Sequence, residues 1–377
     1  MESIFAAIRK NTNAFNLGDE ETWRELYEPF IPPPPGDITL MRDEQYGSAE
    51  RNRLDVYVPS STWPDKPVLL FVHGGGFFSG DKAWSEKCWG NIGYFFAQHD
   101  IVTVTIDHRL VPDIEYPGGA DDIQLAREWV HHNIAKQHFG RGSPDKVVLM
   151  GHSSGGAHIA MNLYGNAATS VFPPVAGIMY FSVPFWYDNT RPIRAKTLRS
   201  YYGSEAQDAW RWKNKCALGL FEGLPDDSSL LDSDQIPTYI GTVKWEVKEA
   251  CDGAVAYFDA YRARSRPAGT LPLFHVLDDH NHLSNMLSIG TADTSQSMPI
   301  LKFVSSCAVK AETRRKPQPA EHGSKNVFPD VHGRRLDVDA WPVPRVRLRP
   351  GRLREIWNHW KPSAAATDCY ALAAWYQ

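Results

Sequence analysis

The chain has 377 residues, of which 42% are hydrophobic and 22% are charged. This length exceeds one ordinary domain, and the composition excludes a disordered chain because it offers enough apolar surface for a sizeable core. No apolar run approaches the roughly 20 residues needed to cross a bilayer. Residues 1–10 lack the basic start and the apolar stretch of a secretory signal. We therefore expect a soluble, cytoplasmic protein with no membrane span.

Cysteines and charge narrow the class further. The five cysteines are widely spaced and form no CxxC pair, which argues against a disulfide framework and against a zinc site. Residues 310–377 hold 13 Lys and Arg against 7 Asp and Glu, which is a net charge of +6. Because the whole chain has a net charge of −4, residues 1–309 have a net charge of −10. An acidic body argues against nucleic acid as the partner. Residues 307–377 are expected to form a basic, Pro/Arg-rich, poorly ordered tail that activity does not require.

Strands and helices alternate along the chain. Residues 1–40 are expected to form a helical segment that ends at four consecutive prolines. The apolar patterns predict strands at 52–59, 68–72, 101–106, 146–150, 177–181, 237–241 and 271–277, and helices at 91–98, 121–134 and from 157. This order predicts an α/β domain over 41–306 with a mainly parallel sheet. The Trp- and Tyr-rich stretch 184–235 fits an inserted cap.

The central motif is a serine in a glycine-rich turn, Gly151-His152-Ser153-Ser154-Gly155-Gly156. It directly follows a predicted strand and precedes a predicted helix. A sharp strand-to-helix turn exposes the serine Oγ, and small neighbours tolerate the crowding around it. Ser153 is therefore the predicted nucleophile, which needs a base to remove its proton.

A run of three glycines, Gly74 to Gly76, follows another buried strand directly after His73. Consecutive glycines leave backbone N–H groups free to converge on an oxyanion, and the residue after the nucleophile supplies a further N–H. Gly75, Gly76 and Ser154 are the predicted donors. We expect His73 to be structural rather than catalytic.

Together with the segment Asp107-His108-Arg109-Leu110-Val111-Pro112, these motifs resemble the hormone-sensitive-lipase-like esterases of the α/β-hydrolase superfamily. The likeness runs from about Leu54 to Ser306, and it implies an α/β-hydrolase fold with a cap. The elbow of that family more often reads GDSAGG. With His152 and Ser154, the elbow of this chain instead resembles that of kynurenine formamidases and their bacterial and fungal relatives. The resemblance extends to hydrolases of fungal secondary metabolism.

The resemblance also implies the other members of a Ser-His-acid triad, in the order serine, acid, histidine. It places the acid after the strand at 237–241, on Glu246, where the family usually has aspartate; Glu249 and Asp252 are alternatives. It places the base after the last strand, on His282, with His280 as the alternative.

These residues predict a serine hydrolase that cleaves a small-molecule carboxylic ester with an apolar or aromatic acyl part. An arylformamidase and a thioesterase remain alternatives with the same machinery. From a different class, a non-catalytic small-molecule receptor can be built on the same fold. No cofactor is implied, and no third ligand with zinc-like spacing accompanies the two histidines. The oligomeric state is not predicted.

Overall fold

The computed structural model describes residues 1–11, 19–165, 171–188, 192–203 and 212–315. The tail predicted at 307–377 therefore lies outside the described residues from position 316 onward, and parts of the predicted cap also lie outside them. Among the described residues, no helix is long and apolar enough to cross a membrane.

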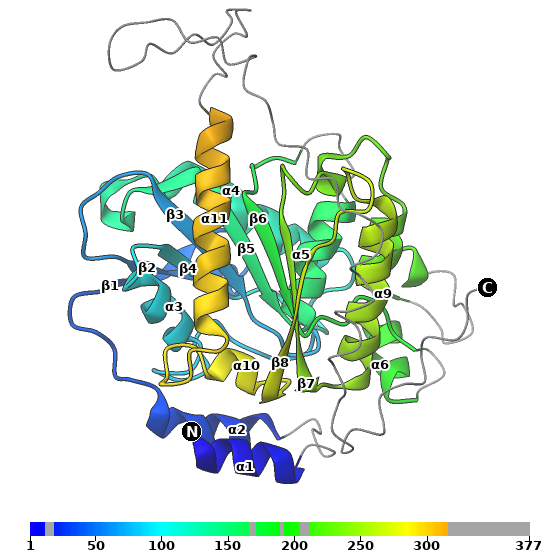
Figure 1. Cartoon of the computed structure of the whole chain (residues 1–377), viewed down its shortest axis with the longest axis horizontal. Helices are drawn as coiled ribbons and strands as arrows, with labels where there is room; N and C mark the ends of the chain where they lie inside the picture. Colours follow the sequence, from blue (N-terminus) through cyan, green and yellow to red (C-terminus); the bar gives the residue numbers. More distant parts are fainter. Residues whose placement is uncertain (12–18, 166–170, 189–191, 204–211, 316–377) are drawn as a thin grey trace, which may run out of the picture. The chain divides into compact units, whose positions relative to one another are not determined.

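An eight-stranded sheet crosses the centre of the molecule (Figure 1). Its strands, in chain order, are β1 Thr39–Gln45, β2 Arg53–Val58, β3 Lys66–Val72, β4 Val102–Ile106, β5 Gly142–His152, β6 Gly177–Phe181, β7 Thr238–Trp245 and β8 Leu273–Asn281. They lie in the order β1-β2-β4-β3-β5-β6-β7-β8. The neighbours from β4 to β8 pair in parallel, and only β2 pairs antiparallel, with β1 and β4. The predicted mainly parallel sheet is confirmed, with one added edge strand, β1.

Helices cover both faces of this sheet. The α-helices are α1 Glu2–Asn11, α2 Glu20–Tyr27, α3 Gly90–Ala97, α4 Gly118–Asn133, α5 Ser154–Gly165, α6 Pro192–Ser200, α8 Ala217–Glu222, α9 Lys248–Arg264, α10 Ser284–Leu287 and α11 Ser297–Arg315. Short 3₁₀ turns are η2 Glu28–Phe30, η3 Gln137–Phe139 and η4 Ser229–Leu231. The predicted N-terminal helical segment corresponds to α1, α2 and η2.

Strand β3 shows why the sheet needs two layers of helices. Its buried side chains alternate: Val68, Leu70 and Val72 belong to one core cluster, whereas Leu69 and Phe71 belong to another. Alternate side chains of a strand point to opposite faces, so an uninterrupted apolar run needs cover on both sides. Helices α4, α5 and α9 contribute to the first cluster, and α3 and α11 contribute to the second.

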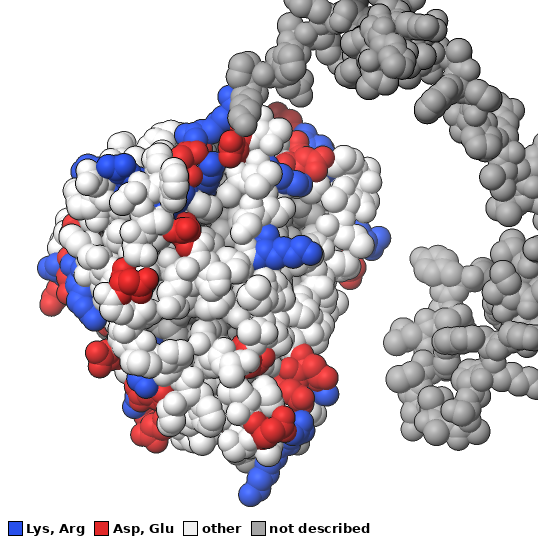
Figure 2. Space-filling model, turned by 60° about the vertical axis from the view of Figure 1, so that its left-hand side comes forward, with Lys and Arg blue, Asp and Glu red and all other residues white. Residues whose placement is uncertain are grey.

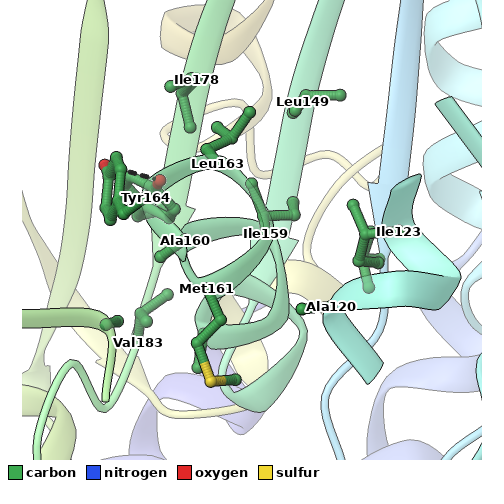
Figure 3. Packing of buried hydrophobic residues seen from close by; sticks show 14 of the residues in the cluster. Ala120, Ile123, Leu149, Ile159, Ala160, Met161, Leu163, Tyr164, Ile178 and Val183 are labelled. Atoms are coloured by element: carbon green, nitrogen blue, oxygen red, sulfur yellow. Dashed lines mark hydrogen bonds between the residues drawn. The ribbon is translucent and has the colours of Figure 1, made fainter. Parts of the chain in front are cut away.

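Helix α5 directly follows the predicted nucleophile, and it is buried along its whole length before its last residue. Figure 3 shows Ile159 and Leu163 of this helix among Leu149 of β5, Ile178 of β6 and side chains of α4. The Tyr164 hydroxyl lies 2.8 Å from the Tyr180 hydroxyl, which satisfies polar atoms inside this core. A helix fixed on all sides holds the turn in front of it in one place.

Charged side chains on the face shown in Figure 2 are mixed in sign, with acidic and basic groups interspersed around a largely uncharged area. The acidic excess of the body is therefore not gathered into one patch on this face.

The last helix, α11, runs to Arg315 and so extends past residue 306, where the domain was expected to end. Cys307, Ala308 and Ala311 are buried beyond that point. The end of the helix also forms ion pairs with the body, from Glu312 to Lys146 at 3.4 Å and from Arg315 to Asp65 at 2.8 Å.

We expect a chain ending at residue 306 to be less stable than a chain ending at residue 315. The shorter chain loses the buried side chains of Cys307, Ala308 and Ala311, whose four side-chain heavy atoms at ~0.8 kcal/mol each amount to about 3 kcal/mol. Urea unfolding of the two chains measures the difference. Equal free energies of unfolding would show that the second half of α11 contributes nothing to the fold.

Candidate active site

Ser153 lies in the turn between β5 and α5, with a φ of +52°. The left-handed region is uncommon for a non-glycine residue and is often found where a functional side chain is held in a fixed position. The turn is tight because strand and helix almost touch: a Cβ on Gly151 would lie 2.4 Å from the Cα of Gly156. The Ser153 N–H donates to the Phe181 carbonyl at 2.9 Å, which ties the turn to β6.

His282 and Glu246 meet Ser153 in an unbroken line of hydrogen bonds. His282 Nε2 lies 3.0 Å from Ser153 Oγ, and His282 Nδ1 lies 2.7 Å from Glu246 Oε1. The side chain of His282 is 8% exposed, and that of Glu246 is 2% exposed. The three residues follow β5, β7 and β8, whose carboxyl ends reach the same edge of the sheet because the strands are parallel.

Other groups hold the Glu246 carboxylate in place. The Val247 N–H donates to Oε1 at 2.9 Å, and the Thr242 hydroxyl lies 3.4 Å from Oε2. With Nδ1–H donating to this carboxylate, the neutral imidazole presents Nε2 as an acceptor to the Ser153 hydroxyl. That arrangement is the one a general base needs.

The alternative residues occupy different positions. The two ring nitrogens of His280 contact Ser284 Oγ and Asp293 Oδ2, each at 2.9 Å, and its side chain is 1% exposed. Glu249 and Asp252 lie on α9, where Asp252 forms an ion pair with Lys248 of the preceding turn. Because both of its ring nitrogens are engaged by Ser284 and Asp293, His280 braces the loop that carries His282.

The predicted oxyanion loop lies against the nucleophile. A Cβ on Gly74 would be 2.8 Å from Ser153 Cβ. Gly75 and Gly76 have φ values of +133° and +63°, which glycine adopts without strain. Among the described residues, neither amide N–H forms a backbone hydrogen bond. The Ser154 N–H, at the first residue of α5, has no partner within the helix.

A buried ion network, which no motif in the sequence predicts, anchors the far end of this loop. Asp107 accepts from the Lys82 backbone N–H at 2.7 Å, and Arg51 donates to the Gly80 carbonyl at 2.8 Å. Burial acts to raise the pKa of Asp107, but the nearby His73 ring, whose Nε2 lies 3.6 Å from the carboxylate, the hydrogen bond from the Lys82 N–H and the charge of Arg51 lower it overall. Lys82 also contacts the fully buried Asp55 at 3.2 Å. The sequence signals were the polar residues after the glycines and the segment that begins at Asp107.

Buried aromatic rings support the same loop from beneath. The rings of His73 and His108 stack at 4.5 Å, and burial lowers the pKa of His108 to about 3. Phe77, directly after the glycines, stacks on Tyr201 of the predicted cap at 4.3 Å, and Tyr202 packs nearby. These cap aromatics are buried and serve packing. Among the described residues, no group of three potential metal ligands gathers.

The N-terminal helices lie against the loop of the candidate base. The Phe5 ring of α1 packs edge-on against His280 at 5.7 Å, and Arg9 forms an ion pair with Asp279 at 3.3 Å. The sequence had indicated helices here but not their place, because nothing in a local pattern says which surface an amphipathic helix covers.

Known proteins resemble this chain in sequence and in structure. The BD-FAE family model matches residues 54–172. Isoprenylcysteine alpha-carbonyl methylesterase of Arabidopsis thaliana is 39% identical over 121 residues, which are 32% of this chain and 26% of that protein. Venom carboxylesterase-6 of Apis mellifera is 30% identical over 167 residues, 40% of this chain and 28% of that protein. The chain spans about a quarter of the length of the methylesterases it matches.

Solved structures with the same architecture cover most of the described chain. A phosphonate-inhibited esterase B from Lactobacillus rhamnosis has a TM-score of 0.62 at 14% identity and covers 84% of this chain and 99% of its own. A thermostable carboxylesterase from a metagenomic library has a TM-score of 0.58 at 18% identity and covers 82% and 98%. These likenesses confirm the α/β-hydrolase fold predicted from the motifs.

The bond between His280 and Asp293 predicts a pH-dependent stability. Burial alone raises the pKa of Asp293, but hydrogen bonds from His280 and Ser295 outweigh it and lower the pKa from its ordinary 3.8 to about 2. A carboxylate with a depressed pKa stabilises the folded state above its ordinary pKa, and that contribution is lost as the pH falls through about 2. We expect Asp293→Asn to be less stable than the parent near neutral pH, with the gap closing between about pH 4 and pH 2. Urea unfolding of both proteins across this range tests it, and a gap that stays constant there would contradict the assignment.

Proposed function

We propose that this chain, which has the α/β-hydrolase fold and resembles the hormone-sensitive-lipase-like esterases, is a serine hydrolase of small-molecule carboxylic esters, with Ser153 as nucleophile. His282 is its general base, Glu246 orients that base, and the backbone of Gly75, Gly76 and Ser154 forms the oxyanion hole. The observation that carries the proposal is the line of contacts from Ser153 Oγ through His282 to Glu246, at 3.0 and 2.7 Å.

The acylation step uses each part of this geometry. His282 Nε2 takes the Ser153 hydroxyl proton as Oγ attacks the ester carbonyl carbon. The N–H groups of the oxyanion loop and of Ser154 stabilise the negative oxygen of the tetrahedral intermediate. His282 then gives the proton to the departing alkoxide, which leaves an acyl-enzyme and the free alcohol.

Deacylation repeats the sequence with water. His282 removes a proton from the water as its oxygen attacks the acyl carbonyl, and returns the proton to Ser153 Oγ when the acid departs. In both halves Glu246 stabilises the transient imidazolium through the 2.7 Å bond to Nδ1. Glutamate serves here as aspartate does in relatives, because the Val247 N–H and the Thr242 hydroxyl hold the longer side chain.

The proposed substrate is an ester rather than an amide, and the names of the relatives support that choice. The relatives reported above are named as methylesterases and carboxylesterases. An apolar or aromatic acyl part was expected from the cap composition, but Tyr201 and Tyr202 are buried against Phe77. The acyl group is therefore best identified by a substrate panel.

We expect Ser153→Ala to lower kcat on p-nitrophenyl esters by at least about 10⁴-fold, because the nucleophile is lost while the fold is kept. A fluorophosphonate probe should label the parent and not the variant. Ser305→Ala, at an exposed serine of α11, is the matched control and should keep full activity.

With N-formylkynurenine added as a substrate, three outcomes contradict the proposal in different ways. Activity retained in Ser153→Ala would show that Ser153 is not the nucleophile. Faster turnover of N-formylkynurenine than of any ester would favour an arylformamidase. A parent that neither hydrolyses an ester nor reacts with the probe would favour a non-catalytic receptor.

The two loop glycines should differ in their tolerance of alanine. A Cβ on Gly75 would lie 1.8 Å from the Ser79 carbonyl oxygen, so Gly75→Ala must displace the loop; a Cβ on Gly76 meets nothing within 4 Å. We expect Gly75→Ala to lower kcat by about 10²–10³-fold, as loss of one oxyanion donor does. Gly76→Ala pays only the left-handed strain of about 1–2 kcal/mol, and its kcat should fall much less. Equal kcat losses would place the donors elsewhere.

A further inference from the structure

His152, the residue before the nucleophile, has a position that the proposed chemistry does not use. It ends β5 and its side chain is buried, with 1% of the residue exposed. Its Nε2 lies 2.7 Å from the backbone carbonyl oxygen of His282. Since a carbonyl only accepts, Nε2 carries the proton and donates.

The other ring nitrogen faces the oxyanion loop. A Cβ on Gly74 would lie 3.2 Å from His152 Nδ1, and Nδ1 is buried with no hydrogen-bond partner among the described residues. The ring also lies 5.0 Å from the His282 ring and 6.1 Å from the Trp89 ring, measured between centroids. One imidazole therefore sits between the nucleophile turn, the loop of the base and the glycine loop.

The segment that carries the base is held by other bonds as well, including one from Asn285 Nδ2 to Ser182 Oγ at 2.9 Å. His282 follows β8 and its loop is braced internally, with Asn281 Oδ1 accepting from the N–H groups of Leu283 and Ser284. Those bonds shape the loop but do not set its distance from β5. The bond from His152 joins the backbone of His282 to the residue that precedes Ser153 and does so over 130 positions of sequence.

We propose that His152 is a positioning residue, which holds the His282 backbone by its Nε2–H bond and so sets the distance between the base and Ser153 Oγ. This inference rests on the proposed function for the meaning of that distance. A shift of about 1 Å in such a pair lowers the rate by about 100-fold, whereas ordinary packing of an imidazole affects only stability.

Burial keeps His152 in the form that the role requires. Desolvation, together with the charge of His282, lowers the pKa of His152 to about 3, so the ring stays neutral when His282 gains a proton. A neutral ring keeps one donor and one acceptor. It adds no positive charge beside the imidazolium.

Two amide variants separate the donor from the bulk of the ring. The side-chain amide of His152→Gln reaches the place of Nε2 and can still donate to the His282 carbonyl. The shorter amide of His152→Asn occupies the place of Nδ1 and falls short of it. Both lose the same aromatic packing, so they are matched controls for stability.

We expect His152→Asn to lower kcat on p-nitrophenyl esters, and the rate of fluorophosphonate labelling, by about 100-fold with KM nearly unchanged. His152→Gln should stay within a few-fold of the parent, while the melting temperatures of the two variants fall together. Equal kcat values in the two variants would overturn the inference. A raised KM with an unchanged kcat in His152→Asn would also overturn it.

A crystal structure of His152→Asn decides the matter without turnover. We expect the His282 loop to move and the His282 Nε2 to Ser153 Oγ distance to exceed its present 3.0 Å. An unchanged distance would overturn the inference. If the parent hydrolyses no ester and takes no probe, the proposed function fails, and this distance still tests the positioning.

Discussion

The imidazole of His282 has to meet two side chains that the chain delivers on other strands, Ser153 after β5 and Glu246 after β7. The contacts of 3.0 and 2.7 Å join positions 129 and 36 residues away. No local interaction can set such distances, and the parallel sheet does so because its strands end at one edge. Every loop at that edge then needs its own support. Without such support, loop motion would disrupt a geometry in which a misplacement of about 1 Å lowers the rate by about 100-fold.

The supports are polar and buried, which sets a second condition on the site. Glu246 is 2% exposed and is held by Val247 and Thr242, while Asp107 is held by the amide of Lys82. A buried carboxylate without partners strongly destabilises a fold, whereas one that accepts several hydrogen bonds is fixed in position. The same bonds that make burial tolerable thus make the loops rigid. At the oxyanion loop the amides of Gly75 and Gly76 form no backbone hydrogen bond among the described residues, so they stay available to a ligand oxygen.

Much of this arrangement could be predicted from sequence, for physical reasons. The run from Val68 to Val72 and the turn around Ser153 are local signals, since they depend on side-chain burial and on backbone crowding within a few residues. The fold followed from their order. Strand β1 could not be predicted from the apolar pattern, because an exposed edge strand lacks a run of buried apolar residues. The end of α11 and the place of α1 could not be predicted, because both depend on contacts with elements that are distant in the sequence. The bond from His152 to the His282 carbonyl escaped because it joins a side chain to a backbone group, which leaves no residue-type signature.

The reaction proposed here creates positive charge on His282, and its surroundings are arranged around that event. Glu246 supplies the negative charge on the Nδ1 side at 2.7 Å. On the elbow side the ring of His152 lies 5.0 Å away, and burial holds its pKa at about 3. A second imidazolium at that distance would oppose the first by Coulomb repulsion, which is strong where water is excluded. A histidine beside a catalytic base is therefore compatible with catalysis only when it is shielded from water and stays neutral. His152 meets this condition because it is buried at the end of β5, next to the glycine loop. Burial thus lets one histidine act as a neutral hydrogen-bond donor beside another that must change its charge.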